Sequence, residues 1–341
     1  MSVKPTDFAY HLSRYLGQHL TGRRGVSPNT VQSYRDTFTL LLRFLEAIDH
    51  IAPERVTLDT LSPECIETFL DWLETTRGCA VATRNLRLAA VHAFFRYLQV
   101  EDPTQLYHCQ LILAIPRKRQ PQSTIAYLPL EGIQALLACP DRTTRTGRRD
   151  LVLISLLYDT GARVQELADL RIEDVRLTAP ATIQLTGKGS KTRIVPLMTP
   201  TSALLGQYIE EANFRGTQRS LRPLFPGRSG NKLTRAGIAY LLNKYAHQAR
   251  DQHPEWIPSV LSPHVMRHSK AMHLLQAGVN LIYIRDLLGH VSVTTTEVYA
   301  RADSEMKRQA LEAAYPSAAS VTMPIWQDNT ELLIWLKSLC K

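Results

Sequence analysis

The stretch SPHVMRHSKAMHLLQAGVNLIYIRDLLGHVSVTTTEVY, residues 262–299, decides the fold of the second half of this chain. Ser262 and Pro263 are the residue types of an N-cap and a first helical position, so a helix is expected to begin there. Gly278 is expected to end that helix, and Gly289 to stop a second, short one. The stretch therefore predicts consecutive short helices joined by glycine turns.

Four polar side chains occupy defined places in this stretch. His264 and Arg267 lie one turn apart at the positively polarised start of the first helix, a place that suits a phosphate group. His290 follows the second helix. Tyr299 comes nine residues later, on a helix that a capping box at Thr294 opens. A tyrosine oxygen is a good nucleophile and a reasonable leaving group, so this set is suited to attack on a phosphodiester.

Two further motifs precede the stretch. Arg163 follows a glycine turn at a helix start, and Glu166 lies three residues later, where it either orients the site or forms an ordinary surface pair. Alternating residues around Gly187-Lys188-Gly189 predict a β-hairpin with the lysine at its tip. Such a lysine suits a general acid for a departing 5′ oxygen, with Lys191 as its nearest competitor. The hairpin lacks the pattern of a nucleotide-binding loop, which argues against nucleotide hydrolysis.

Six residues with complementary roles thus follow one another in a single order. They are Arg163, Lys188, His264, Arg267, His290 and Tyr299. In this order they resemble the tyrosine recombinase family, also called the lambda integrase or Xer family. They fill the family's six catalytic places, and Glu166 fills the accompanying acidic place. The resemblance covers about residues 128–299, and the helical first half resembles the family's core-binding domain.

The resemblance implies a fold that is mainly α-helical with a small β-hairpin or sheet. A helical, SAM-like core-binding domain and a mixed α+β catalytic domain would form a C-shaped clamp on double-stranded DNA. Four copies of the chain would assemble on two specific recombination sites, with room for accessory proteins. Strands would be cut through 3′-phosphotyrosine links and exchanged through a Holliday junction. No metal or other cofactor is implied.

The charge balance favours a polyanionic partner. Lys and Arg number 40 against 31 Asp and Glu, which gives a net charge of +9 and an isoelectric point near 9.4. Through residue 120 there are 14 basic and 12 acidic residues, and 26 and 19 afterwards, so the surplus lies with the half that carries the motifs. Nucleic acid is the leading candidate, although charge alone is equally compatible with mere solubility.

Cysteine usage and hydropathy indicate a cytoplasmic protein. The five cysteines are scattered and form no Cys-x-x-Cys pair, which argues against a disulfide framework or a zinc knuckle. The first residues lack an apolar signal region, and no stretch is long enough to cross a bilayer. We expect a protein of the reducing cytoplasm, associated with the nucleoid through its DNA partner.

Four segments are expected along the chain. Residues 1–114 read as a helical DNA-binding domain, because apolar residues recur there at helical spacing. Residues 115–126 form a basic linker with two prolines. Residues 127–316 form the catalytic domain. Residues 317–341 are a tail with a short apolar helix, which packs either on its own domain or on a neighbouring subunit.

Basic side chains outside the catalytic set are candidates for phosphate contacts. On the first domain, the linker and the hairpin they are Arg84, Arg87, Arg117, Lys118, Arg119 and Lys191. A solvated helix face is an equally good reading of the first two, whereas a linker that runs along DNA favours the basic triplet.

The biological role stays open at this level. The chain is longer than the compact dimer-resolving members of the family, which favours integration or transposition of a mobile element over Xer-type dimer resolution. A type IB topoisomerase uses similar chemistry, but the short helical first domain and the Leu-Gly-His spacing favour a recombinase. A DNA-binding protein without catalysis is disfavoured by the intact set of six residues.

Overall fold

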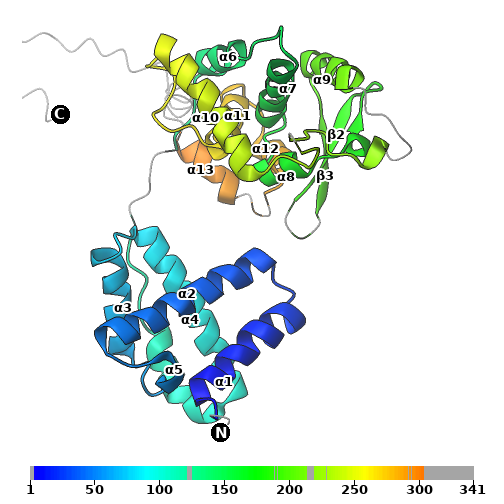
Figure 1. The fold of residues 1–341 in the computed structure, drawn as a ribbon. Coiled ribbons are helices and arrows are strands. Elements are labelled where there is room, and N and C mark those ends of the chain that lie inside the picture. Colours follow the sequence, from blue (N-terminus) through cyan, green and yellow to red (C-terminus); the bar gives the residue numbers. More distant parts are fainter. Residues whose placement is uncertain are drawn as a thin grey trace, which may run out of the picture. The chain divides into compact units, whose positions relative to one another are not determined.

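The computed structural model describes residues 4–120, 125–187, 189, 191–212, 219–227, 229–290, 292 and 294–302. The chain divides into two compact units, Met1–Ser123 and Thr124–Lys341 (Figure 1). The predicted tail and Lys188 lie outside the described residues. The expected clamp and the four segment boundaries stay predictions. In the part of the chain that is described, no helix is both long and apolar enough to cross a membrane.

The first unit is a bundle of helices, as its apolar spacing predicts. Two of its helices begin with a serine N-cap followed by proline: the Ser27 hydroxyl accepts from the backbone N–H of Thr30, and the Ser62 hydroxyl from that of Cys65. Buried phenylalanines from four helices fill its centre. Its elements are α1 (Asp7–Arg14), the π-helix η1 (Tyr15–Arg23), α2 (Pro28–Ile48), η2 (Pro53–Arg55), α3 (Pro63–Thr75), α4 (Val81–Glu101), η3 (Pro103–Gln105) and α5 (Leu106–Leu113).

The second unit combines helices with one small sheet (Figure 1). The predicted hairpin is confirmed as β2 (Thr182–Thr186) and β3 (Thr192–Pro196), which pair antiparallel with Ile183 opposite Val195. A short strand β1 (Val175–Arg176) adds to the other edge of β2 and was not predicted. The helical elements are α6 (Leu130–Ala138), α7 (Arg145–Asp159), α8 (Val164–Asp169), η4 (Ile172–Asp174), α9 (Thr199–Ala212), η6 (Arg219–Leu221), α10 (Arg235–Gln252), α11 (Pro263–Gln276), α12 (Leu281–Leu288) and α13 (Thr294–Ala302).

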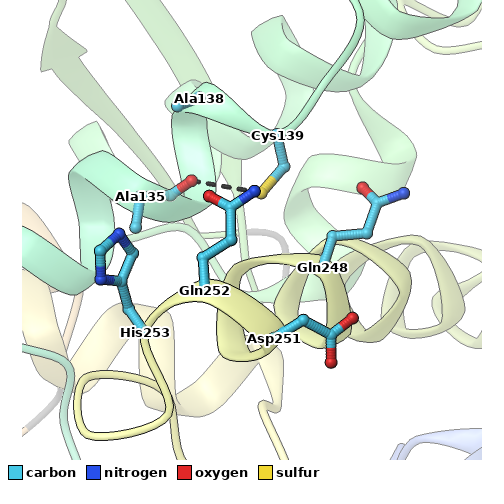
Figure 2. A pocket seen from close by; sticks show the side chains of 7 residues that line it. All are labelled: Ala135, Ala138, Cys139, Gln248, Asp251, Gln252 and His253. Atoms are coloured by element: carbon cyan, nitrogen blue, oxygen red, sulfur yellow. Dashed lines mark hydrogen bonds between the residues drawn. The ribbon is translucent and has the colours of Figure 1, made fainter.

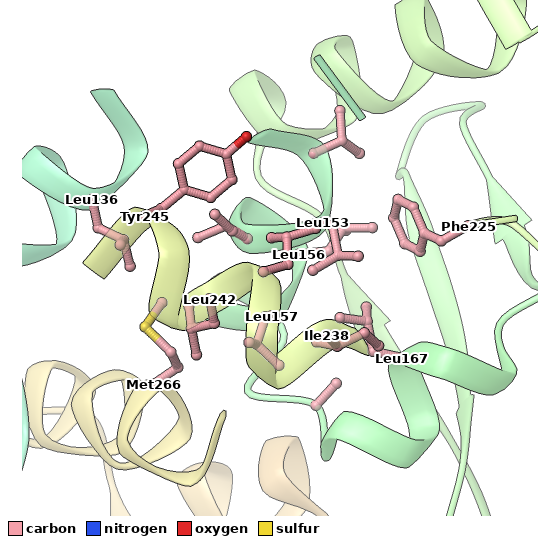
Figure 3. Close-up of a cluster of buried hydrophobic side chains, with 14 of the residues drawn as sticks. Leu136, Leu153, Leu156, Leu157, Leu167, Phe225, Ile238, Leu242, Tyr245 and Met266 are labelled. Carbon is pink, nitrogen blue, oxygen red and sulfur yellow. The ribbon is translucent and has the colours of Figure 1, made fainter. Parts of the chain in front are cut away.

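Helix α7 is the centre of the second unit. Its residues from Leu151 to Leu157 are all buried. Leu153, Leu156 and Leu157 lie in one cluster with residues of α8 and α10 and with Phe225 (Figure 3). Met266 of α11 joins the same cluster. Because packed interiors hold side chains in fixed positions, the turn that follows α7 and leads to Arg163 is well anchored.

Helices α11, α12 and α13 share a smaller apolar cluster. Ala271, Met272 and Leu275 of α11 contact Ile284 and Leu288 of α12, and the ring of Tyr299 joins them. Two glycines with positive φ, at 278 and 289, end the first two helices as expected. The ring of Tyr299 is therefore held by packing, and its hydroxyl is the part that can form hydrogen bonds.

Candidate active site

A buried carboxylate organises the site. Glu166 on α8 is 4% exposed, and its two oxygens accept from two arginines. Arg163 donates its backbone N–H at 2.9 Å and Nη1 at 2.8 Å. Arg193 of β3 donates Nη1 at 3.0 Å and Nη2 at 2.7 Å. Burial alone raises the pKa of Glu166, but the hydrogen bonds from Arg193 and Arg163 outweigh it and lower the pKa to about 2. The carboxylate therefore stays charged and fixes both guanidinium groups.

Three arginines hold the C-terminal end of α12. The carbonyl oxygens of residues 287–289 accept, in that order, from Arg193 Nε at 2.8 Å, Arg267 Nη2 at 2.5 Å and Arg163 Nη2 at 3.2 Å. Carbonyls at a helix C-terminus have no partner within the helix and carry partial negative charge, so cations suit them. The network thus fixes the turn at the end of α12 relative to the two predicted arginines.

Arg267 is the most deeply buried cation of the set. It is 3% exposed, and its Nη1 donates to the carbonyl of Gly161 at 2.7 Å. Burial, followed by the charges of Arg163 and Arg193, lowers the pKa of Arg267 to about 10, so it is still protonated at neutral pH. A guanidinium has five N–H donors, and backbone carbonyls take two of these. In the part of the chain that the structure describes, its other three donors have no hydrogen-bond partner and are available to an anion.

The hydroxyl of Tyr299 lies inside the site. The side chain is 3% exposed, and its Oη lies 2.9 Å from Nδ1 of His268. The Tyr299 ring is stacked against that of His290, with centroids 6.4 Å apart and planes at 14°. Burial raises the pKa of Tyr299, and the charge of Arg267 opposes this only in part. The phenol is therefore protonated at neutral pH.

His290 directly follows Gly289, whose backbone has a left-handed conformation with a φ of 64°, which favours glycine. Its Nδ1 lies 2.9 Å from Oγ1 of the buried Thr296. Burial, together with the charges of Arg267 and Arg163, lowers the pKa of His290 to about 4. The imidazole is neutral at physiological pH and can act as a hydrogen-bond donor.

The hairpin reaches the same site, although the predicted Lys188 is outside the described residues. A Cβ on Gly187 would lie 2.9 Å from Oε1 of Glu166 and 3.7 Å from Nη1 of Arg163. A side chain there would displace the carboxylate, so the sequence has glycine. The residue before Lys188 is thus in contact with the arginine network, whereas Lys191 is exposed.

Two residues of the site were missed by sequence reasoning. His268 lies four residues after His264, so the two share a helix face, and their rings are 6.4 Å apart. His264 itself is exposed at the start of α11. Arg193 lies two residues before the buried Val195, on the inward face of its strand. The sequence contained a sign of each residue: His268 is a second histidine at helical spacing, and Arg193 is an arginine at an inward strand position.

The two arginines expected on a charged helix face are engaged within the first unit. Arg84 is 8% exposed and pairs with Glu74 at 3.3 Å. Arg87 donates Nη1 to the backbone carbonyl of Ser33 and to the hydroxyl of Thr37, each at 3.0 Å. The reading of a freely solvated face is therefore wrong for these two residues, and phosphate contacts by them stay a prediction.

In the basic triplet at the start of the linker, one residue is engaged within the first unit and two are exposed. Lys118 donates Nζ to Glu74 at 2.9 Å, and its backbone is hydrogen-bonded to the side chain of Asn85. Arg117 and Arg119 are exposed. The two arginines are the better placed of the three for contact with a polyanion.

A pocket of about 520 Å³ lies between α6 and α10, and none of the predicted site residues lines it (Figure 2). The thiol of Cys139 donates to the carbonyl of Ala135 at its edge. Burial raises the pKa of this thiol, so it is a poor nucleophile. The lining residues are Ala135, Ala138, Cys139, Gln248, Asp251, Gln252 and His253.

Arg193→Lys is expected to lower the stability of the second unit by about 2 kcal/mol, because lysine cannot hold Glu166 and the carbonyl of Leu287 together. In scanning calorimetry of the full chain, the transition of this unit should move down by roughly 4–8 °C. Arg171→Lys, at an exposed pair with Glu173, is the matched control and should move it little. Equal shifts in the two variants would contradict a bridging role for Arg193.

Family models match both units of the chain. The model of the phage integrase family matches residues 126–306, and that of the phage integrase N-terminal SAM-like domain matches residues 12–102. The y4rC protein of Sinorhizobium fredii, which bears the name of an integrase/recombinase, is 38% identical over 99% of this chain and 100% of its own length. The tyrosine recombinase XerD of Listeria innocua is 30% identical over 86% of this chain and 95% of its own.

Solved structures have the same fold. The XerH site-specific recombinase bound to palindromic difH substrate matches with a TM-score of 0.68 and 24% identity, over 89% of this chain and 84% of that one. The Tn1549 transposon integrase in complex with transposon right end DNA matches with a TM-score of 0.68 and 17% identity, over 89% of this chain and 99% of that one. The fold and the family models together define a tyrosine recombinase. The chain belongs to the phage integrase family, and it is a site-specific DNA recombinase.

Proposed function

We propose that this recombinase cuts and rejoins double-stranded DNA through a 3′-phosphotyrosine bond to Tyr299 and exchanges strands through a Holliday junction. The observation that carries the proposal is the buried Tyr299 hydroxyl, which lies in the field of Arg267 and beside two histidine rings. A buried phenol among cations and imidazoles has little structural value by itself. It is what a tyrosine nucleophile requires.

The other side chains have distinct roles in this proposal. Arg163 and Arg267 neutralise the non-bridging oxygens of the scissile phosphate, and their fixed guanidinium groups need no reorganisation during the reaction. His264 and the neutral His290 donate hydrogen bonds to the same phosphate. Lys188 gives a proton to the departing 5′ oxygen. Energy is conserved in the phosphotyrosine bond, so rejoining requires no nucleotide cofactor.

Specific recombination sites on double-stranded DNA are the proposed partner, bound by a homotetramer on paired sites. The basic surplus of the chain and the exposed Arg117 and Arg119 support phosphate contacts. Of the proteins that share the fold, XerH is described as bound to palindromic difH substrate, and the Tn1549 integrase as in complex with transposon right end DNA. Phosphate contacts of this kind position a protein on a duplex, whereas base contacts give sequence specificity.

The biological role that we propose is integration or transposition of a mobile element. The integrase/recombinase y4rC matches the full length of this chain, and a transposon integrase shares its fold. Resolution of chromosome or plasmid dimers is the second candidate, because XerD of Listeria innocua is 30% identical over most of the chain.

The proposal is tested by trapping DNA on the protein. The full chain is incubated in excess chelator with a library of duplexes that includes the flanks of its own gene, then denatured and analysed by mass spectrometry. We expect a nucleotide adduct on Tyr299. Sequences from the ends of a mobile element would support the proposed role, and one chromosomal site would support dimer resolution. Tight, saturable binding without any adduct would contradict the cleavage chemistry.

Lys188→Ala is expected to slow cleavage of ordinary DNA by about 10²-fold, the low end of the range for loss of a general acid. A substrate with a 5′-bridging sulfur should restore the rate, because a thiolate leaves without a proton. Single-turnover adduct formation on both substrates measures the effect, with Lys191→Ala as the matched control. A rate that the sulfur fails to restore would remove Lys188 from this role.

A further inference from the structure

Within the described residues, His268 is the hydrogen-bond partner of the Tyr299 hydroxyl. Its Nδ1 lies 2.9 Å from Oη, and the two ring centroids are 5.6 Å apart with planes at 58°. His268 follows Arg267 on α11 and shares a helix face with His264. The residue is half-buried, so few waters compete for its ring nitrogens.

We propose that His268 is the catalytic proton acceptor for Tyr299. This inference rests on the proposed function, in which Tyr299 is the nucleophile. In the cleavage step the Tyr299 O–H bond breaks and its proton passes to Nδ1 of His268, while Oη forms a bond to phosphorus. The bond from phosphorus to the 5′ oxygen breaks, and that oxygen takes its proton from the general acid. On rejoining, the 5′ hydroxyl attacks phosphorus and its proton returns to the deprotonated general acid. The bond from phosphorus to Oη breaks, and His268 returns its proton to the Tyr299 oxygen.

The surroundings of His268 keep it neutral and ready to accept. Burial, and then His264 and the charge of Arg267, lower the pKa of His268. The other groups that face it are the neutral His290 and Tyr299 itself. Since burial raises the pKa of Tyr299, the proton stays on the phenol in the resting protein. Transfer accompanies formation of the bond to phosphorus, so the proton leaves only when a phosphate is present.

A second histidine–tyrosine pair on the same helix provides a control. Nδ1 of His273 lies 2.9 Å from the hydroxyl of Tyr158, and His273 is half-buried like His268. In the described part of the chain, neither member of this pair is hydrogen-bonded to Arg163, Arg267 or Glu166. The two pairs have the same local geometry and differ in their distance from the phosphate-binding arginines along the helix.

The first test needs no DNA. Nitrogen chemical shifts of ¹⁵N-histidine-labelled full-length protein report which ring nitrogen carries the proton. We expect an unprotonated, hydrogen-bonded Nδ1 in His268, with a shift that changes in Tyr299→Phe and stays in Tyr158→Phe. A proton on Nδ1 at neutral pH would overturn the inference, because the phenol would then be the acceptor.

The second test is kinetic and uses a duplex that the wild-type protein traps. His268→Asn keeps an oxygen near the place of Nδ1 but cannot take a proton. We expect single-turnover adduct formation to fall by about 10²-fold at pH 7 and to recover progressively as the pH is raised toward the pKa of the phenol. The wild type should be almost independent of pH over that range, and His273→Asn should follow the wild type.

The outcomes separate this inference from the function on which it rests. Wild-type rates in His268→Asn would overturn the role of His268 while leaving Tyr299 as nucleophile. A loss that alkali does not repair would assign His268 to positioning and would also overturn it. If the wild-type protein forms no adduct with any duplex, the proposed function itself fails, and the nitrogen shifts still decide whether His268 can accept a proton.

Discussion

Tyr299→Phe is expected to abolish covalent attachment of DNA while leaving DNA affinity within about twofold. Removing a nucleophile from an enzyme of this kind costs roughly 10⁶-fold in rate, because the remaining groups have no atom to act upon. The phenylalanine ring keeps the stacking with His290 and the apolar contacts with Ile284 and Leu288. Only the hydrogen bond to His268 is lost, worth about 1 kcal/mol, so the fold should persist.

The measurement pairs an adduct assay with a binding assay on the same duplex. Tyr283→Phe is the matched control, because Tyr283 lies on the adjacent α12 and is 71% exposed. The control should retain both activities. An adduct that survives at the wild-type rate in Tyr299→Phe would show that another side chain is the nucleophile, whereas loss of binding together with cleavage would indicate a structural defect.

The sequence predicted the elements with strong local signals. Helix ends of two kinds can be located from the sequence alone, because only a few residue types supply the capping side chain or the backbone freedom that they need. They are the N-caps at Ser27, Ser62 and Ser262 and the helix end at Gly289. The strand β1 was missed because two residues carry no period. Its partner β2 is the next strand along the chain, with Val175 opposite Ile183, but the pairing leaves no alternating pattern in so short a strand.

The sequence predicted which residue types form the site and their order along the chain. It did not predict the hydrogen bonds that connect them. Arg163 and Glu166 are adjacent on a helix, and their contact follows from spacing. The bridge from Glu166 to Arg193 spans 27 residues. The three carbonyls at residues 287–289 bind arginines that are 94, 21 and 126 residues away in the sequence, and single-sequence patterns do not relate such positions. The contact of His268 with Tyr299 joins positions 31 residues apart, which local spacing does not relate.

Glu166→Gln is the substitution expected to damage the scaffold most. The carboxylate accepts from four donors, two on each oxygen. A glutamine has one oxygen and one NH₂ group, so in either orientation two donors of Arg163 and Arg193 face another donor. The buried Arg267 also loses the larger of the two contributions, from Glu166 and Tyr299, that raise its pKa. Breaking a buried ion pair by neutralising one partner typically costs about 3–5 kcal/mol, and Arg163 contributes less than Arg193 because its side chain is 36% exposed.

The pH dependence gives a second, independent measure of the same contribution. The pKa of Glu166 in the folded protein is about 2, below its ordinary value of 4.5, so the charged form stabilises the fold. A difference of this size corresponds to about 3 kcal/mol, present in full above the ordinary value and lost as the pH falls from 4.5 toward 2. Other groups titrate in both the wild type and Glu166→Gln, so their effects on stability largely cancel in the difference between the two proteins.

Calorimetry of the full chain should therefore show that Glu166→Gln lowers the transition of the second unit by roughly 6–12 °C near neutral pH. The gap between variant and wild type should close as the pH is lowered through the window from 4.5 to 2. Glu173→Gln, at an exposed pair with Arg171, should give a small gap. A gap for Glu166→Gln that is independent of pH would mean that its shape, and not its charge, supports Arg163 and Arg193. The arginines would then need no carboxylate to stay in place for phosphate.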